Sequence, residues 1–186
     1  YNEADFHVVY QEDQLGDGHA ILQAADWINS EHVAVLFGDD IFSGEHSGIA
    51  QLMAAHDALT SDDQGAILAL EKLEDSQISQ KGIVEVGSIH ATIERLQSIK
   101  SLVEKPNLED APSNLGIVGR YIVPRSTIDL LPSVGASHGG EIRLIDALIE
   151  QLGSIPIHGL ECTGIRLDTG TPEGYARAVQ VLTADL

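Results

Sequence analysis

The chain has 186 residues, of which 29 are acidic and 10 basic, and its formal charge is −19. Such a surface repels nucleic acid and anionic membranes, so we expect neither as a partner. The single cysteine, Cys162, excludes an internal disulfide and fits a cytoplasmic setting. No apolar run reaches spanning length. The length predicts one domain over residues 1–186.

The first 70 residues alternate between two kinds of apolar pattern. Continuous apolar runs over 6–10, 33–37 and 66–70 predict strands, the last two buried on both faces. Apolar residues at helical spacing predict helices over 19–28 and 47–59. This order predicts a mostly parallel sheet with right-handed crossovers. The inward residues of the second helix are expected to be Ile49, Leu52, Met53 and Ala55.

After residue 70 the pattern changes to short strands. Strands are predicted over 82–86, 92–96, 101–106, 115–123, 155–158 and 165–167, the first two flanking a turn at Gly87 and Ser88. Helices are predicted from Pro124 to 131, over 141–152, and from Thr171 to 181, since proline suits a first helical turn.

The predicted strand over 33–37 ends in Gly38, Asp39 and Asp40. Ligands of open α/β sheets bind beyond the carboxyl ends of strands, and a carboxylate there can hold a divalent cation against a phosphate. Gly and Asp also form ordinary turns, so this strand end by itself leaves both interpretations open. The same holds for Gly16 and Gly18, whose position before a helix suits an anion or a plain turn.

Six sequence runs occur in a fixed order along the chain. They are Gly16-Asp-Gly-His-Ala20, Gly38-Asp39, Leu102-Val-Glu-Lys-Pro106, Ala111-Pro-Ser-Asn-Leu-Gly-Ile-Val-Gly-Arg-Tyr121, Gly140-Glu-Ile-Arg-Leu-Ile-Asp-Ala147 and Leu167-Asp-Thr-Gly-Thr-Pro-Glu-Gly-Tyr175. Together they resemble the sugar-1-phosphate nucleotidyltransferases, and within them the bacterial UTP–glucose-1-phosphate uridylyltransferases, over about 9–175. The resemblance implies a three-layer α/β, Rossmann-like fold of the nucleotide-diphospho-sugar transferase type.

The same resemblance implies a reaction and a cofactor. Glucose 1-phosphate would attack the α-phosphorus of UTP, giving UDP-glucose and pyrophosphate, with Mg²⁺ as cofactor. All reacting groups are anionic, so catalysis would rest on charge neutralisation and alignment. By motif match, Asp39 and Asp168 would bind Mg²⁺, and Lys105 would contact the sugar phosphate, with Asp39 and Lys105 as the catalytic residues. Asp40 is interpreted as a solvated or supporting carboxylate.

The remaining motif matches imply substrate-binding residues. On the sugar side they are Gly82, Glu104, Lys105, Asn114 and Glu141, and on the base side Gln11 and Gly16. A glutamine can donate and accept at once, as the imide edge of uracil requires. Taken without the family, Glu104 could be a surface carboxylate, Asn114 a turn residue and Glu141 a helix N-terminal carboxylate. His19 is equally compatible with the uridylyl branch and with a helix start.

The family's Gly-x-Gly-Thr-Arg loop and Pro-x-x-Lys element, which serve the nucleotide triphosphate, do not occur in these 186 residues. We therefore expect an N-terminally truncated family domain with little turnover of its own. A thymidylyl-, cytidylyl- or adenylyltransferase of the same fold is the first alternative, and residues 11–19 favour uracil over it. A non-catalytic sugar-phosphate-binding or assembly module is the second. A homo-oligomer formed through an exposed strand edge is also expected.

Overall fold

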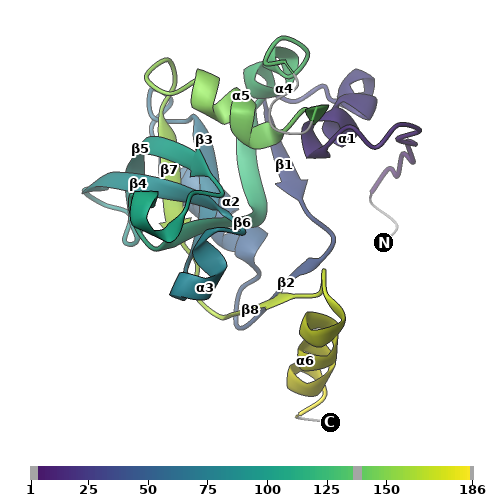
Figure 1. The fold of residues 1–186 in the computed structure, drawn as a ribbon. Helices are drawn as coiled ribbons and strands as arrows, with labels where there is room; N and C mark the ends of the chain where they lie inside the picture. Colours follow the sequence, from purple (N-terminus) through teal and green to yellow (C-terminus); the bar gives the residue numbers. More distant parts are fainter. Residues whose placement is uncertain (1–3, 136–139, 185–186) are drawn as a thin grey trace. The chain divides into compact units, whose positions relative to one another are not determined.

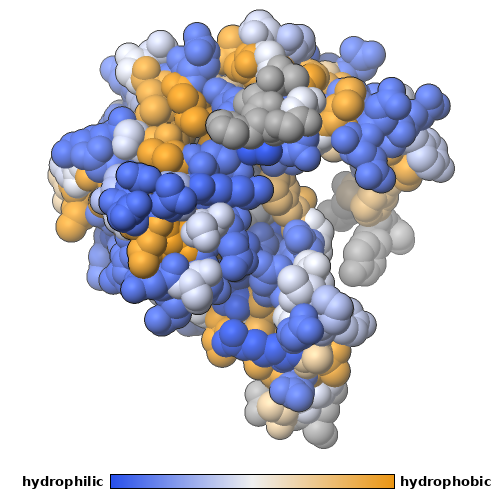
Figure 2. All heavy atoms as spheres, viewed as in Figure 1, coloured by the Kyte–Doolittle hydropathy of each residue, from blue (hydrophilic) through white to orange (hydrophobic). Residues whose placement is uncertain are grey.

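A computed structural model describes residues 4–135 and 140–184 (Figure 1). The contacts of the chain divide it into two compact units, which are described separately. One unit comprises Tyr1–Val33 and Pro124–Gln151, and the other Ala34–Val123 and Leu152–Leu186. Within the described ranges, no helix is both long and apolar enough to cross a membrane. On the face drawn in Figure 2, hydrophilic residues predominate, as the charge of −19 leads one to expect.

The central element is a six-stranded sheet with the strand order β1-β6-β3-β7-β5-β4. β3 runs parallel to β7 and antiparallel to β6, and β5 runs antiparallel to both β4 and β7. The α/β class is confirmed, but the sheet is mixed rather than mostly parallel, because β6 pairs antiparallel with β3 and β5 pairs antiparallel with β4 and β7. The strands are β1 (His32–Leu36), β3 (Ala66–Lys72), β4 (Gly82–Ile89), β5 (Leu96–Glu104), β6 (Leu115–Pro124) and β7 (Ile157–Glu161).

The strand β1 was expected to be buried on both faces, and this expectation is wrong. β1 is an edge strand of the described sheet, and its Leu36 is 50% exposed. The first five residues of β3, by contrast, are all buried. An apolar run cannot distinguish the two cases, because burial depends on what lies beside the strand rather than on the strand itself.

A second, two-stranded sheet pairs β2 (Asp40–Ser43) antiparallel with β8 (Ile165–Asp168). β2 was not predicted, since its four residues carry no period of their own. Helices α2 (Gly48–Ala58), α3 (Asp75–Ile78) and α6 (Pro172–Leu182) belong to the same unit. Ser47 and Thr171 cap α2 and α6 by accepting a backbone N–H, which satisfies an otherwise free donor of the first turn.

Helix α2 packs on the core through a narrow stripe of residues. Leu52 and Ala55 join a buried cluster with residues of β3, β6 and β7, among them Ile67, Val118 and Leu160. Met53 was expected to face inward, but it is 52% exposed. The buried positions Gly48, Gln51, Leu52 and Ala55 recur at helical spacing, which turns position 53 away from the core.

Between β4 and β5 the structure corrects the predicted turn. β4 continues through Gly87 and Ser88, and the reversal occurs over residues 90–95, with Arg95 at a φ of +64°. The strand predicted over 101–106 is the end of β5. Gly87 sits at an irregular stretch of the ladder where Ser98 Oγ occupies the place of a Cβ, so this glycine marks a close approach rather than a turn.

The other unit contains α1 (Asp17–Gln23), a 3₁₀ turn (Ala25–Trp27), α4 (Arg125–Leu130) and α5 (Leu144–Glu150). These helices confirm the predicted ones with shorter bounds. The strand predicted over 6–10 is wrong, because the segment is irregular and no described strand pairs with it. Phe6 and Tyr10 are 76% and 81% exposed, so the apolar run there is unburied.

Candidate active site

Asp39 and Asp168 meet at one point although they are far apart in the sequence. The backbone N–H of Thr169 donates to the carbonyl oxygen of Asp39 over 2.8 Å, next to the β2–β8 ladder. A Cβ placed on Gly170 would lie 2.9 Å from Asp39 Oδ2 and 3.2 Å from Asp168 Oδ1. The two carboxylates therefore face one small space that only a glycine at position 170 leaves open.

The charge of Asp168 is held by two cations and one backbone group. Its Oδ2 accepts from Lys81 Nζ and from Arg166 Nη2, each at 2.9 Å, and its Oδ1 accepts the N–H of Gly170 at 3.1 Å. Burial by itself would raise the pKa of Asp168, but the bonds from Lys81 and Gly170 and the charges of Lys81 and Arg166 lower this pKa to about 2. The carboxylate is therefore ionised throughout the neutral range.

The carboxylates of Asp39 and Asp168 can supply only some of the ligands that a divalent cation needs. Within residues 4–135 and 140–184, no group of three or more His, Cys, Asp or Glu side chains is placed to hold a metal ion. Mg²⁺ needs only one or two protein carboxylates when phosphate and water oxygens complete its shell. Asp39 and Asp168 are thus the residues that could hold such an ion over Gly170, with phosphate and water oxygens completing its shell.

Sequence reasoning missed the buried ion cluster beneath this space. Asp40 is 5% exposed, pairs with Arg166, and accepts the N–H of Gly119 at 2.7 Å. Of the two interpretations given for Asp40, the solvated carboxylate is therefore wrong and the supporting carboxylate is confirmed. Arg166 also pairs with Glu71 at 3.1 Å. Burial opposes the charge of Arg166, yet Asp40, Glu71 and Asp168 raise its pKa. An arginine inside the short apolar strand over 165–167 was the available signal.

Three of the expected sugar-side residues, Gly82, Glu104 and Lys105, meet at the paired ends of β4 and β5. Gly82 lies opposite Glu104 in the ladder, and the N–H of Lys105 donates to the carbonyl oxygen of Lys81 over 3.1 Å. Lys105 has a φ of +46°, which is rare for a residue with a side chain, and its Nζ lies 3.6 Å from Glu104 Oε1. Such an outlier often marks a functional position. Lys81 was not predicted, although it directly precedes Gly82.

Asn114 lies one residue before β6, and its side chain is exposed. Its carbonyl oxygen accepts the N–H of Leu73 at 2.9 Å, which ties this turn to the end of β3. The neighbouring Ser113 Oγ donates to the carbonyl oxygen of Val84 on β4 over 2.6 Å. These bonds place Asn114 in the same unit as Gly82 and Glu104.

The expected base-side residues gather in the other unit. Gln11 Nε2 donates to the carbonyl oxygen of Gly16 at 2.9 Å and lies 3.0 Å from His19 Nδ1. Gly16 has a φ of +102°, and a Cβ there would lie 2.4 Å from the carbonyl oxygen of Ile142. Only glycine fits this position. Glu141 was expected on the sugar side, but it lies in this unit beside Ile142, where it forms an ion pair with Arg143.

The structure thus brings the predicted residues together as two groups, one in each unit. Gln11, Gly16 and Glu141 lie in the first, and Asp39, Gly82, Glu104, Lys105, Asn114 and Asp168 in the second.

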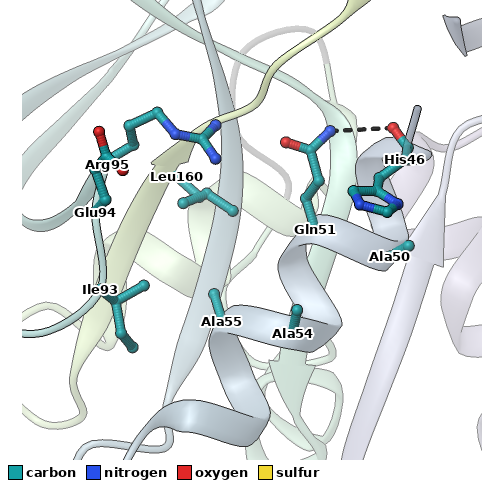
Figure 3. Close-up of a pocket in the computed structure, with 9 residues that line it drawn as sticks. All are labelled: His46, Ala50, Gln51, Ala54, Ala55, Ile93, Glu94, Arg95 and Leu160. Atoms are coloured by element: carbon teal, nitrogen blue, oxygen red, sulfur yellow. Dashed lines mark hydrogen bonds between the residues drawn. The ribbon is translucent and has the colours of Figure 1, made fainter. Parts of the chain in front are cut away.

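Two cavities of the second unit help to locate the site. One of about 240 Å³ borders Asp168 and is also lined by Arg166 and Arg177. Another of about 340 Å³ lies against α2, where Arg95 extends over an apolar floor toward Gln51 (Figure 3). The amide of Gln51 is already bonded to His46 and Thr163. None of the predicted site residues lines the cavity of Figure 3, whereas Asp168 lines the other cavity.

Paired carboxylates after β1 and at the end of β8, with two lysines at the paired ends of β4 and β5, form an arrangement suited to phosphate chemistry. The nucleotidyl transferase family model matches residues 2–185, and the chain belongs to this family. The chain is 34% identical over 175 residues to UTP–glucose-1-phosphate uridylyltransferase YngB of Bacillus subtilis, covering 94% of the chain and 57% of that protein. A UTP–glucose-1-phosphate uridylyltransferase of Komagataeibacter xylinus is 34% identical over 157 residues, covering 84% of the chain and 52% of that protein.

Solved structures give the same answer for the fold. A UDP-glucose pyrophosphorylase complexed with UDP-glucose superposes with a TM-score of 0.84 at 32% identity, over 95% of this chain and 65% of that one. A UTP-bound UGPase from Acinetobacter baumannii gives 0.79 at 27% identity, over 94% and 58%. The resemblance and the nucleotidyltransferase fold are confirmed. The chain spans a little more than half the length of the curated relatives named above.

Proposed function

We propose that this chain forms part of a UTP–glucose-1-phosphate uridylyltransferase, which converts UTP and glucose 1-phosphate to UDP-glucose and pyrophosphate. One observation supports this most directly. Lys81 connects the Asp39–Asp168 pair to the end of β5, because its ammonium binds Asp168 and its carbonyl oxygen binds the N–H of Lys105. The carboxylates of Asp39 and Asp168, which would hold a cation, and the ammonium of Lys105, which would hold a phosphate, are therefore linked within one unit through Lys81.

The roles of the residues follow from their chemistry. Lys105 would hold the phosphate of glucose 1-phosphate by a charge-assisted hydrogen bond. Glu104 would accept hydrogen bonds from sugar hydroxyls, and Gly82 opposite it has no side chain to block a hexose. Mg²⁺, when bound by Asp39 and Asp168, would neutralise charge on the phosphate oxygens of both substrates. The reaction would then depend on alignment of anions, with no protein nucleophile.

Base recognition is proposed for the unit that contains Gln11 and Gly16. The Gln11 amide could turn from the Gly16 carbonyl to the imide edge of uracil, offering one donor and one acceptor. The alternatives within the family are transfer of a thymidylyl, cytidylyl or adenylyl group. Competition among UTP, dTTP, CTP and ATP for the chain separates them, and a preference for any base other than uracil would replace the uridylyl assignment.

The experiment that tests the proposal is equilibrium binding. The 186-residue chain is titrated with glucose 1-phosphate and with UTP in Mg²⁺ by calorimetry, and pyrophosphate release is followed in the same samples. We expect saturable binding of glucose 1-phosphate and turnover far below the ordinary enzyme range of ~1–10³ s⁻¹, because the sequence contains no Gly-x-Gly-Thr-Arg loop. If the chain shows no binding of glucose 1-phosphate but binds another sugar phosphate, the proposed substrate is wrong.

A further inference from the structure

Lys81 lies beside the proposed sugar-phosphate subsite, and the roles proposed above assign it no contact with a substrate. The chain has four lysines, Lys72, Lys81, Lys100 and Lys105. Two of them share one rung of the sheet. Gly82 lies opposite Glu104 in an antiparallel ladder, so Lys81 and Lys105 are the next opposed residues, and a backbone bond of 3.1 Å joins them.

Two like charges on opposed residues of neighbouring strands destabilise each other. In this structure each lysine has its own carboxylate. Lys105 Nζ lies 3.6 Å from Glu104, and Lys81 Nζ lies 2.9 Å from Asp168 Oδ2. The Lys81 side chain is 23% exposed and the Lys105 side chain 53%, so the lysine of the shorter pair is also the less exposed one. A chain with 10 basic residues thus places two cations at one rung beside the carboxylate pair.

We propose that Lys81 is a second phosphate-binding residue of the sugar-phosphate subsite, which rests on the proposed function of that site. A phosphate dianion held at this rung would relieve the repulsion between the two lysines and accept a charge-assisted bond from each. The lysine stem is flexible and its ammonium donates in three directions, so Nζ can serve Asp168 and a phosphate together or in turn. Asp168 keeps Arg166 as a partner in either case.

A purely positioning role is the alternative, in which Lys81 only orients Asp168 toward the space over Gly170. The two roles differ in what remains once Asp168 loses its charge. A lysine that binds phosphate directly still contributes in an Asp168→Asn background, whereas a lysine that acts through Asp168 contributes nothing there. The double-mutant comparison therefore separates them.

The test is calorimetric titration of the full 186-residue chain with glucose 1-phosphate, glucose and inorganic phosphate, with and without Mg²⁺. The variants are Lys81→Met, Lys81→Arg, Asp168→Asn, and Lys81→Met combined with Asp168→Asn. Lys72→Met is the matched control, since Lys72 is exposed and pairs with Glu161 at 3.6 Å. Circular dichroism melting checks that each variant is folded.

We expect Lys81→Met to weaken glucose 1-phosphate and phosphate by about 10- to 100-fold, to spare glucose, and to do so also beside Asp168→Asn. Lys81→Arg should stay within about 3-fold of the parent chain and Lys72→Met should match it. An unchanged affinity in Lys81→Met, or an effect that vanishes beside Asp168→Asn, overturns the inference. A parent chain that binds phosphate through Lys81 but not glucose 1-phosphate overturns the proposed function alone, and one that binds neither overturns both.

Discussion

Asp40 and Asp168 are opposed residues in the β2–β8 ladder, and the guanidinium of Arg166 pairs with both carboxylates. The first of these carboxylates is buried, while the second borders the proposed metal space. One side chain therefore serves the stability of the unit and the orientation of the site. The two roles can be measured separately.

Replacing Arg166 by methionine should destabilise the chain strongly. Asp40 would keep its bond from Gly119 but lose its cation at 5% exposure, and breaking a buried ion pair costs about 3–5 kcal/mol. Urea unfolding followed by circular dichroism measures the loss. The control is Arg177→Met on α6, an exposed arginine whose replacement should stay within about 0.5 kcal/mol. Equal losses in both variants would contradict the importance of the buried cluster.

Replacing Gly170 by alanine should weaken Mg²⁺ or Mn²⁺ binding by about 10-fold or more without unfolding the chain. The added Cβ would lie 2.9 Å from Asp39 Oδ2, which a carboxylate oxygen cannot accept without moving. An ion with a bond length of about 2.0–2.1 Å tolerates little such movement. Gly38→Ala is the control, because a Cβ there meets nothing within 4 Å. Undiminished Mn²⁺ affinity, measured by electron paramagnetic resonance, would exclude a shared ion at this point.

Lys105→Ala should reduce the affinity for glucose 1-phosphate far more than the affinity for UTP. Loss of a charge-assisted bond to phosphate costs on the order of 1.5–3 kcal/mol. Calorimetry with each ligand gives both affinities. Lys100→Ala removes an exposed lysine from β5, which ends one residue before Lys105, and should change neither affinity. If the sugar phosphate binds Lys105→Ala as tightly as the parent chain, the role assigned to the Glu-Lys-Pro motif is wrong.

The buried His158 predicts a loss of stability in mild acid. Burial lowers the pKa of His158 below 6.5, despite the opposing hydrogen bond to the carbonyl oxygen of Asp63. As the pH falls, the unfolded chain therefore binds a proton at this histidine before the folded chain does. The contribution of neutral His158 to the stability of the folded chain is complete above pH 6.5 and is lost as the pH falls toward the folded pKa. The slope can reach about 1.4 kcal/mol per pH unit.

The measurement is urea unfolding between pH 7.5 and 5.0 for the parent chain and for His158→Gln. The parent should lose stability more steeply than the variant below pH 6.5. His46→Gln, which changes an exposed histidine, should follow the parent. Parallel curves for parent and His158→Gln would show that another group governs the acid sensitivity.

Local patterns in the sequence predicted most helices and strands, because hydrophobic period and caps are local properties. Ser47, Thr171 and Pro172 marked helix starts that the structure confirms. The prediction of a strand over 6–10 was wrong for the opposite reason. A strand needs a pairing partner, and the sequence of the segment itself does not show whether such a partner is present. The same non-local information decides that β1 is an edge and that β6 separates it from β3.

The site divides in the same way. Motif order pointed to Asp39, Asp168, Glu104 and Lys105, which the structure places in one unit. Lys81 was not predicted as a site residue, because it lies in a charged stretch without hydrophobic periodicity. Only the strand register shows that it lies opposite Lys105. Arg166 and the burial of Asp40 depend on the pairing of β2 with β8, which joins segments from opposite ends of the chain.

The pairing of β2 with β8 also has a kinetic consequence. This ribbon closes a loop that contains residues 44–164, yet a two-stranded pair is by itself barely stable in water. Its amide hydrogens should therefore exchange with deuterium faster than those of β3, through local opening that leaves the six-stranded sheet intact. Each opening would part Asp39 from Thr169 and so dissolve the proposed ion site. A bound divalent ion would stabilise the closed ribbon and slow its amide hydrogen exchange. The exchange rate of the Thr169 amide would therefore report how much of the site is occupied.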